Sequence, residues 1–169
     1  MIYPVRPMLV TGVMFWQVVL AIHIIVVVAA FGLLVSYPIL AAGAERIDRR
    51  SAPVLLRARV VLGRSIVNPG LVVVVVAGVY LASKLHQWHE FYVQWGIGAS
   101  IVIGAIEGMF VLRRTPKLAD LAQRDIDASG GAEISWSTEY LAARSRVDQV
   151  NVLLALLVLV TVYLMAVGG

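Results

Sequence analysis

The chain has 169 residues, of which 60% are hydrophobic and only 14% are charged, and its mean hydropathy is +0.88. In soluble domains about a quarter of the residues are charged, so these values indicate an integral membrane protein. The absence of cysteine excludes disulfides, thiolate metal sites and a cysteine nucleophile. The pI near 9.8 also occurs among nucleic-acid-binding proteins, but here the basic residues lie beside apolar segments, so we expect no nucleic-acid partner.

The amino-terminal stretch 1–10 precedes an apolar run that is too long for a signal peptide and lacks a convincing small-residue cleavage site. We therefore expect the first apolar segment, 11–40, to stay in the mature protein. Within it, the run 18–35 contains no Lys, Arg, Asp or Glu and holds a single titratable group, His23.

Four segments are long and apolar enough to cross a bilayer. They are 11–40, 65–83, 91–112 and 149–169. Lipid permits helices or a closed barrel, and long runs without a period of two exclude the barrel. The sequence thus predicts one all-α domain over 1–169, a four-helix bundle that passes several times through the plasma membrane, with the lipid bilayer as its surroundings.

Charge predicts the orientation of the bundle. Twelve of the 14 Lys and Arg residues lie in two stretches: Arg46, Arg49, Arg50, Arg57, Arg59 and Arg64, then Arg113, Arg114, Lys117, Arg124, Arg144 and Arg146. The connection between the second and third segments has only Lys84. By the positive-inside rule both basic stretches face the cytoplasm and both termini face outward. The aromatic cluster Trp88, Phe91, Tyr92 and Trp95 fits an outer interfacial belt.

Proline and glycine indicate short cytoplasmic helices in the two basic connections. Pro53 can open a helix that leads into the second segment. Asn68, Pro69 and Gly70 are expected to interrupt that helix with a kink near the inner interface, because proline removes one backbone donor and crowds the preceding turn.

The connection between the third and fourth segments carries similar signals. Thr115 followed by Pro116 predicts a helix start, and Gly130 with Gly131 predicts its end. Ser137 is a suitable cap for a second helix that continues into the fourth segment.

Segment 91–112 carries Gly96, Ser100, Gly104 and Gly108 at a strict spacing of four, which places these small residues on one helix face. Such a face lets another backbone approach closely, either within the bundle or in a self-associated dimer. Gly96 and Gly98 also begin a pattern like a dinucleotide fingerprint, but no strand precedes them and the third glycine is missing, so we reject that motif.

Glu107 is the only acid in the third segment and lies about one and a half turns before Arg113 and Arg114. A carboxylate at that depth is costly unless it is paired. Arg64 and Asn68 on the second segment have a similar depth, so we expect one of them to contact Glu107. The alternative is a role in proton handling or ligand binding.

His86, His89 and Glu90 form an H-x-x-H-E string at the outer mouth. Two histidines three residues apart on a helix can share a metal ion, but the string differs from the zincin motif and lies among interfacial aromatic residues. We interpret it as an interfacial anchor.

His23 lies near midplane depth, and the residues at matching depth, around Val75, Ile103 and Leu157, offer no polar side chain. The imidazole then has two possible partners. One is a backbone carbonyl or a Ser or Thr hydroxyl. The other is the iron of haem or another tetrapyrrole, because neutral imidazole is the usual axial ligand and helix bundles build cofactor sites from core side chains.

Several motifs together carry a resemblance that covers nearly the whole chain. They are the midplane histidine of the first segment, G-R-x-x-x-N-P-G at 63–70, V-Q-W at 93–95 and Tyr-Leu-Met at 163–165. With them the chain resembles a family of small bacterial four-helix membrane proteins of unknown function. It is more distantly similar to membrane protoporphyrinogen oxidases of the HemJ type and to CopD-like copper-resistance membrane proteins.

The resemblance to the oxidases implies that His23 is a functional residue with haem b as the cofactor. It also implies a lysine on the third helix, where this chain has Trp95, with Lys84 nearby at the end of the second segment. The terminal Lys-Pro of that family is replaced by Gly168 and Gly169.

Three functions follow as expectations. The first is a non-catalytic membrane protein, either accessory to a larger membrane complex or homo-oligomer, or a tetrapyrrole carrier that uses His23. The second is a haem-dependent porphyrinogen oxidase. The third is a small transporter-like element, although the sequence has no pair of broken helices and only Glu107 as an intramembrane acid.

Overall fold

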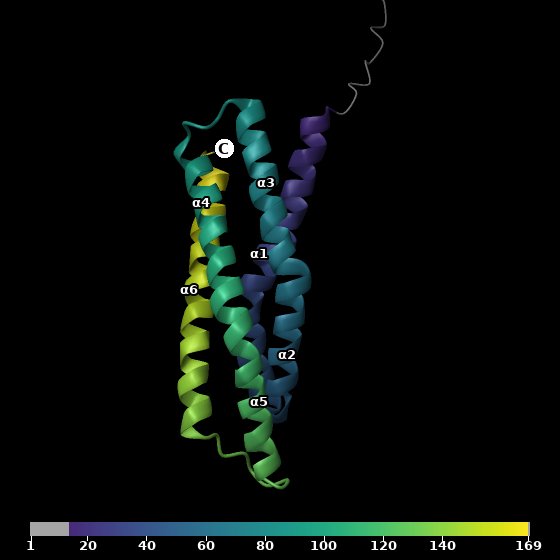
Figure 1. Ribbon diagram of the computed structural model, residues 1–169, viewed down its shortest axis with the longest axis vertical. Coiled ribbons are helices and arrows are strands. Elements are labelled where there is room, and N and C mark those ends of the chain that lie inside the picture. Colours follow the sequence, from purple (N-terminus) through teal and green to yellow (C-terminus); the bar gives the residue numbers. More distant parts are fainter. Residues whose placement is uncertain (1–13, 169) are drawn as a thin grey trace, which may run out of the picture.

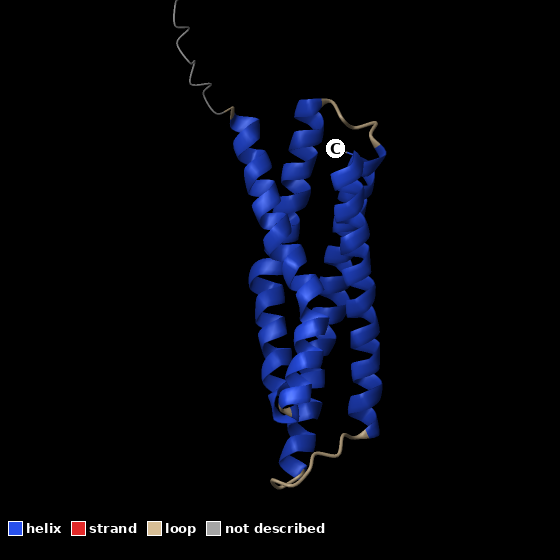
Figure 2. Cartoon of the chain, turned by 180° about the vertical axis from the view of Figure 1, so that it is seen from behind, coloured by secondary structure: helices blue, strands red, loops and turns tan. Residues whose placement is uncertain are grey.

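The computed structural model describes residues 14–168, and the structural statements below concern this part of the chain. The predicted start of the first segment at 11 lies outside it. Six α-helices follow one another: α1 Phe15–Ile47, α2 Ala52–Leu62, α3 Asn68–Leu85, α4 Phe91–Ile106, α5 Leu112–Ala128 and α6 Thr138–Gly168. Figure 2 shows helices joined by short connections, without strands in the described residues.

These six helices make four long rods. A π-helical turn, Gly63–Val67, joins α2 to α3, and a second one, Glu107–Val111, joins α4 to α5. Each of the four rods is long and apolar enough to cross a membrane. The rods have 33, 37, 38 and 31 residues, where the second rod includes the 3-10 turn Arg49–Ser51 that precedes α2. About 20 residues suffice for a bilayer core, so each rod has a part that extends beyond it. The predicted all-helical fold with four candidate spans is confirmed.

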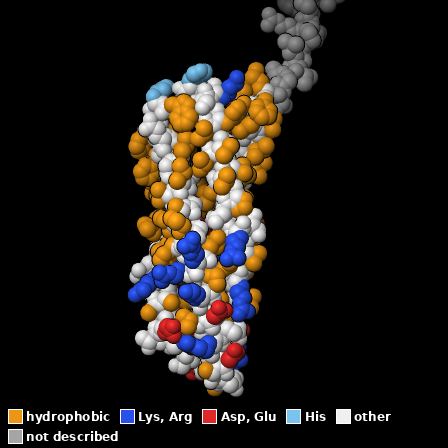
Figure 3. Space-filling view, in the orientation of Figure 1, with side chains coloured by type: hydrophobic (Ala, Val, Ile, Leu, Met, Phe, Trp, Pro, Cys, Tyr) orange, Lys and Arg blue, Asp and Glu red, His pale blue; other side chains and the backbone are white. Residues whose placement is uncertain are grey.

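The two ends of the bundle differ in composition. One end, which we call the basic end, holds the α1–α2 and α5–α6 connections, and the α3–α4 connection lies at the opposite end (Figure 1). Figure 3 shows Lys and Arg side chains gathered over the half next to the basic end. Hydrophobic side chains cover the other half, which contains α3 and α4 and which we call the apolar half.

The bundle has two buried cores, one in each half. The larger joins α1, α3, α4 and α6 around Ala30, Phe31, Leu34, Val67, Leu71, Ile103, Val111, Leu154 and Val158. The smaller joins α2, α5 and α6 around Ala52, Leu56, Leu118, Ala119, Ala122, Tyr140 and Val147. The basic end is therefore a packed helical structure rather than a pair of loops.

Several helix ends lie where the sequence predicts them. Pro53 occupies the first turn of α2. Gly130 and Gly131, with φ of 56° and 94°, follow the end of α5, because a left-handed backbone favours glycine. The hydroxyl of Ser137 accepts a hydrogen bond of 3.2 Å from the backbone N–H of Tyr140 and so caps α6.

The predicted interruption at Asn68–Gly70 has a counterpart just upstream: the π-helical turn Gly63–Val67 separates α2 from α3, and Asn68 N–H donates to the Gly63 carbonyl. One predicted helix start is wrong. No helix starts at Thr115, because α5 runs through Pro116 and the Thr115 hydroxyl donates to the Val111 carbonyl at 2.7 Å. The helices expected in the basic connections are thus extensions of the spanning rods.

Candidate functional site

A buried ion pair joins two of the rods where the halves of the bundle meet. Nη1 of Arg59, on α2, donates to Oε1 of Glu107 at 2.5 Å, and Nη2 donates to Oε2 at 2.6 Å. Arg59 is 4% exposed and Glu107 is 0% exposed. Two parallel, charge-assisted bonds of this kind are the strongest geometry available to a guanidinium and a carboxylate.

The pair lies between the two cores. Glu107 begins the π-helical turn whose last residue, Val111, belongs to the larger core. Arg59 comes one turn after Leu56, which belongs to the smaller core. Both charges are therefore enclosed by packed side chains, at the level where the apolar run of the third rod ends.

Glycine and tyrosine shape the space around the pair. A β-carbon on Gly63 would lie 3.1 Å from Oε1 of Glu107 and 3.3 Å from Nη1 of Arg59, so only glycine leaves the pair undisturbed at this position. On the other side, the ring of Tyr37 lies 4.9 Å from the Arg59 guanidinium carbon, a cation–π contact between α1 and α2.

The partner of Glu107 corrects the sequence prediction. Arg64 is exposed, because it follows Arg59 by five residues and so points about 140° away around the helix. Asn68 lies near the Gly108 backbone instead, with its Nδ2 3.4 Å from where a Gly108 β-carbon would be. Neither residue supplies a hydrogen bond to Glu107 among the described contacts.

The sequence did contain a signal for Arg59. Arg59 and Gly63 are four residues apart and share one helix face, so the glycine leaves a path for the long arginine side chain toward the apolar half. The depth of Arg64, the last basic residue before the second apolar segment, does not predict how far the Arg59 side chain extends toward the apolar half.

The chemistry available to the pair is limited. A guanidinium does not lose its proton in proteins, and both oxygens of Glu107 already accept hydrogen bonds. Three buried polar atoms near this level have no partner in residues 14–168: Nε of Arg59, Oδ1 of Asn68 and Nδ2 of Asn151. Asn151 follows Val150, which packs on the larger core, so α6 also presents a polar group to the junction.

His23 lies in the apolar half between α1 and α3. Its imidazole is half-buried, contacts the Val74 backbone, and has its Cε1 3.6 Å from where a β-carbon on Gly78 would be. Nδ1 is buried and has no hydrogen-bond partner among the described residues. From Phe15 to Ala29 no residue of α1 is fully buried, so this imidazole is a polar group on a sparsely enclosed helix.

The histidines of the α3–α4 connection do not meet at one point. His86 takes a left-handed backbone with φ of 59° and ends α3. His89 lies 3.1 Å from Glu90 in an exposed pair. Within residues 14–168, no group of three or more His, Asp or Glu side chains is placed to hold a metal ion.

The small-residue face of α4 contacts two different helices. A β-carbon on Gly96 would overlap the Cε of Met165 on α6, and one on Gly104 would lie 3.6 Å from Leu71 on α3. Ser100, between them, is buried. Nearby, the indole N–H of Trp95 donates to the Thr161 hydroxyl at 3.2 Å, a second link between α4 and α6.

Over residues 14–168, fold and site together define an all-helical bundle with four candidate membrane spans and a buried ion pair. Comparison of the chain with protein families, with curated proteins and with solved structures finds no match. The resemblances carried by the sequence motifs therefore stay expectations.

Proposed function

We propose that the chain is a non-catalytic, multi-pass protein of the plasma membrane that works as an accessory component of a larger membrane complex. The observation that carries this proposal is the part of α1 from Phe15 to Ala29, in which no residue is fully buried. A helix of a partner protein laid along this part of α1 would pack against its exposed side.

The exposed face of α1 is suited to such a partner. Phe15, Val18, Ile22, Ile25 and Val28 recur at helical spacing and are 43–71% exposed. In Figures 1 and 2 this part of α1 lies beside α3 and away from α4 and α6.

The geometry of the ion pair supports a structural rather than a catalytic role for Arg59 and Glu107. Both oxygens of Glu107 are bonded to Arg59, and Gly63 and Tyr37 close the space around them. A carboxylate held in this way joins two helices, and because Glu107 is 0% exposed, neither of its oxygens is open to a substrate.

For the orientation, we propose that the basic end faces the cytoplasm and that both termini face outward. The two arginine-rich connections lie at one end of the bundle, as a common cytoplasmic location requires (Figure 3). Residues 1–13 lie outside the described part of the chain, so the position of the amino terminus follows from the path of α1.

Photo-crosslinking in native membranes tests the accessory role. A photoreactive amino acid at Ile25 or Val28, each 67% exposed, should form one protein adduct of defined mass. The matched control is Leu156 on α6, 56% exposed, which should form only lipid adducts. Copies with two different tags distinguish a homo-oligomer from a complex with another protein. Lipid adducts alone at all three positions would contradict the proposal.

A second candidate function, tetrapyrrole binding through His23, is favoured by the unpartnered Nδ1. A free ring nitrogen suits an axial ligand of haem, but the space does not: a β-carbon on Gly78 would already touch the imidazole at 3.6 Å, so there is room for about a methyl group between His23 and α3, and a flat macrocycle needs the two helices farther apart. An optical spectrum of protein purified with excess haem decides the matter. A Soret band that disappears in His23→Ala would establish haem binding through His23. We expect no Soret band in the wild-type protein.

A further inference from the structure

A cavity of about 660 Å³ lies between α5 and α6, next to the basic end. Its charged lining consists of Arg114, Lys117, Arg124, Arg146, Asp120 and Glu139. Its remaining lining is apolar, from both helices. A volume in this range accommodates a ligand the size of a phospholipid headgroup with its glycerol.

The two acids of the cavity are already engaged. Glu139 accepts a hydrogen bond from Nη2 of Arg124 at 3.1 Å, and Asp120 lies 3.8 Å from Arg57 outside the cavity. The negative charge of the lining is therefore offset by protein cations, and the remaining basic side chains are available to an anion.

Three cations of the cavity lining have no ion pair with the described residues 14–168: Arg114, Lys117 and Arg146. Arg114 lies over the ring of Phe110, with its guanidinium carbon 5.3 Å from the ring centre. This contact holds the guanidinium against the cavity wall and leaves its N–H donors for a ligand.

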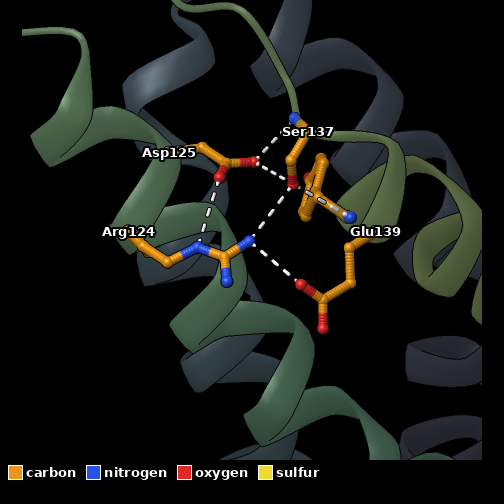
Figure 4. A network of polar contacts seen from close by, with 5 residues as sticks. Arg124, Asp125, Ser137 and Glu139 are labelled. Carbon is orange, nitrogen blue, oxygen red and sulfur yellow. Dashed lines mark hydrogen bonds and ion pairs between the residues drawn. The ribbon is translucent and has the colours of Figure 1, made fainter.

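The cavity changes from apolar to polar along its length. Phe110 lines it where the apolar run of the third rod ends, and Arg114 follows one turn later, at headgroup depth if the rod crosses a bilayer. Toward the α5–α6 connection the cavity is lined by Arg124 and Glu139. Figure 4 shows the ion pair between them, and beside it the Ser137 hydroxyl donates to Asp125 at 2.8 Å. A ligand with one apolar and one anionic end matches this gradient.

We propose that this cavity binds an anionic phospholipid from the membrane leaflet at the basic end. Its phosphate is held by Arg114, Lys117 and Arg146, and its first acyl carbons lie against Phe110 and Val147. Basic pockets between membrane helices on the cytoplasmic side are the kind of site that recognises anionic headgroups. This inference is independent of the accessory role, because it concerns a different face of the bundle.

Native mass spectrometry of the full chain, released from detergent with added phosphatidylglycerol, tests the site. The wild-type chain should retain one phosphatidylglycerol and should not retain phosphatidylcholine. The triple variant Arg114→Gln, Lys117→Gln and Arg146→Gln should lower the affinity for phosphatidylglycerol about 100-fold, because each basic side chain contributes about a factor of five.

The matched control changes the same charge outside the cavity, in Arg46→Gln, Arg49→Gln and Arg113→Gln, whose side chains are exposed. It should retain the lipid within about twofold, because those residues do not line the cavity. Arg114→Lys with Arg146→Lys should keep most of the binding and shows that the cavity still folds. Equal loss in both triple variants would mean a general charge effect and would overturn the proposal. So would displacement of the lipid by an excess of inorganic phosphate, which would assign the cavity to a soluble anion.

Discussion

Gly63 and Leu112 bring two rods into direct contact: a β-carbon on Gly63 would lie 2.6 Å from Cδ2 of Leu112. The same β-carbon would press on the Arg59–Glu107 pair. Leu112 can rotate away, but the two charged groups cannot move without weakening their hydrogen bonds.

Gly63→Ala should therefore destabilise the bundle by about 1–3 kcal/mol, the usual cost of adding a methyl group to a packed interior. Gly43→Ala is the control, because nothing lies within 4 Å of its β-carbon position and alanine favours helix. Reversible unfolding in detergent measures both. Equal stability of the two variants would show that the contact at Gly63 is loose.

A double-mutant cycle measures the ion pair itself. Glu107→Leu should cost about 3–5 kcal/mol, because it leaves the Arg59 guanidinium buried and uncompensated. Adding Arg59→Met should recover most of this loss, since apolar residues of similar volume replace buried pairs at little cost. If the two substitutions are simply additive, the pair contributes nothing as a pair. Glu107→Gln keeps the shape of the side chain and loses the charge, so its loss of unfolding free energy should lie between zero and that of Glu107→Leu.

Much of the fold could be predicted because hydropathy and positional rules act locally. Local sequence alone predicts the four apolar helices, the helix start at Pro53 and the helix end at Gly130 and Gly131. The partner of Glu107 could not be predicted from depth alone. It depends on the direction in which Arg59 leaves its helix and on two π-helical turns, which follow from packing between distant segments.

The small-residue face of α4 offers a test that separates internal packing from self-association. Gly96→Val should destabilise the single chain by about 1–3 kcal/mol, because the added carbons meet Met165. Gly98→Val is the matched control, with the same helix propensity cost and nothing within 4 Å. A change of oligomeric state with unchanged stability of the single chain would instead indicate a dimer interface.

His23→Leu should change the stability by less than about 1 kcal/mol. The substitution loses the contact with the Val74 backbone, but it also removes a buried nitrogen that has no partner, and these effects oppose each other. Unfolding in detergent measures the difference. A loss of several kcal/mol would show that Nδ1 has a partner that stabilises the bundle.

The orientation can be read from single cysteines, because the natural chain has none. Ser83→Cys, near the end of α3, should react with a membrane-impermeant reagent in intact cells. Ser51→Cys, at the basic end, should react only after the membrane is opened. The opposite labelling pattern would place the arginine-rich connections outside, against the positive-inside rule.

The Arg59–Glu107 pair also restricts how the rods can move. It joins the second and third rods beside both π-helical turns, at one height in the bundle. Sliding one rod along the other would break two hydrogen bonds between buried charges, whereas tilting about the pair keeps them. The pair therefore favours tilting of the two rods about this level over sliding of one rod along the other.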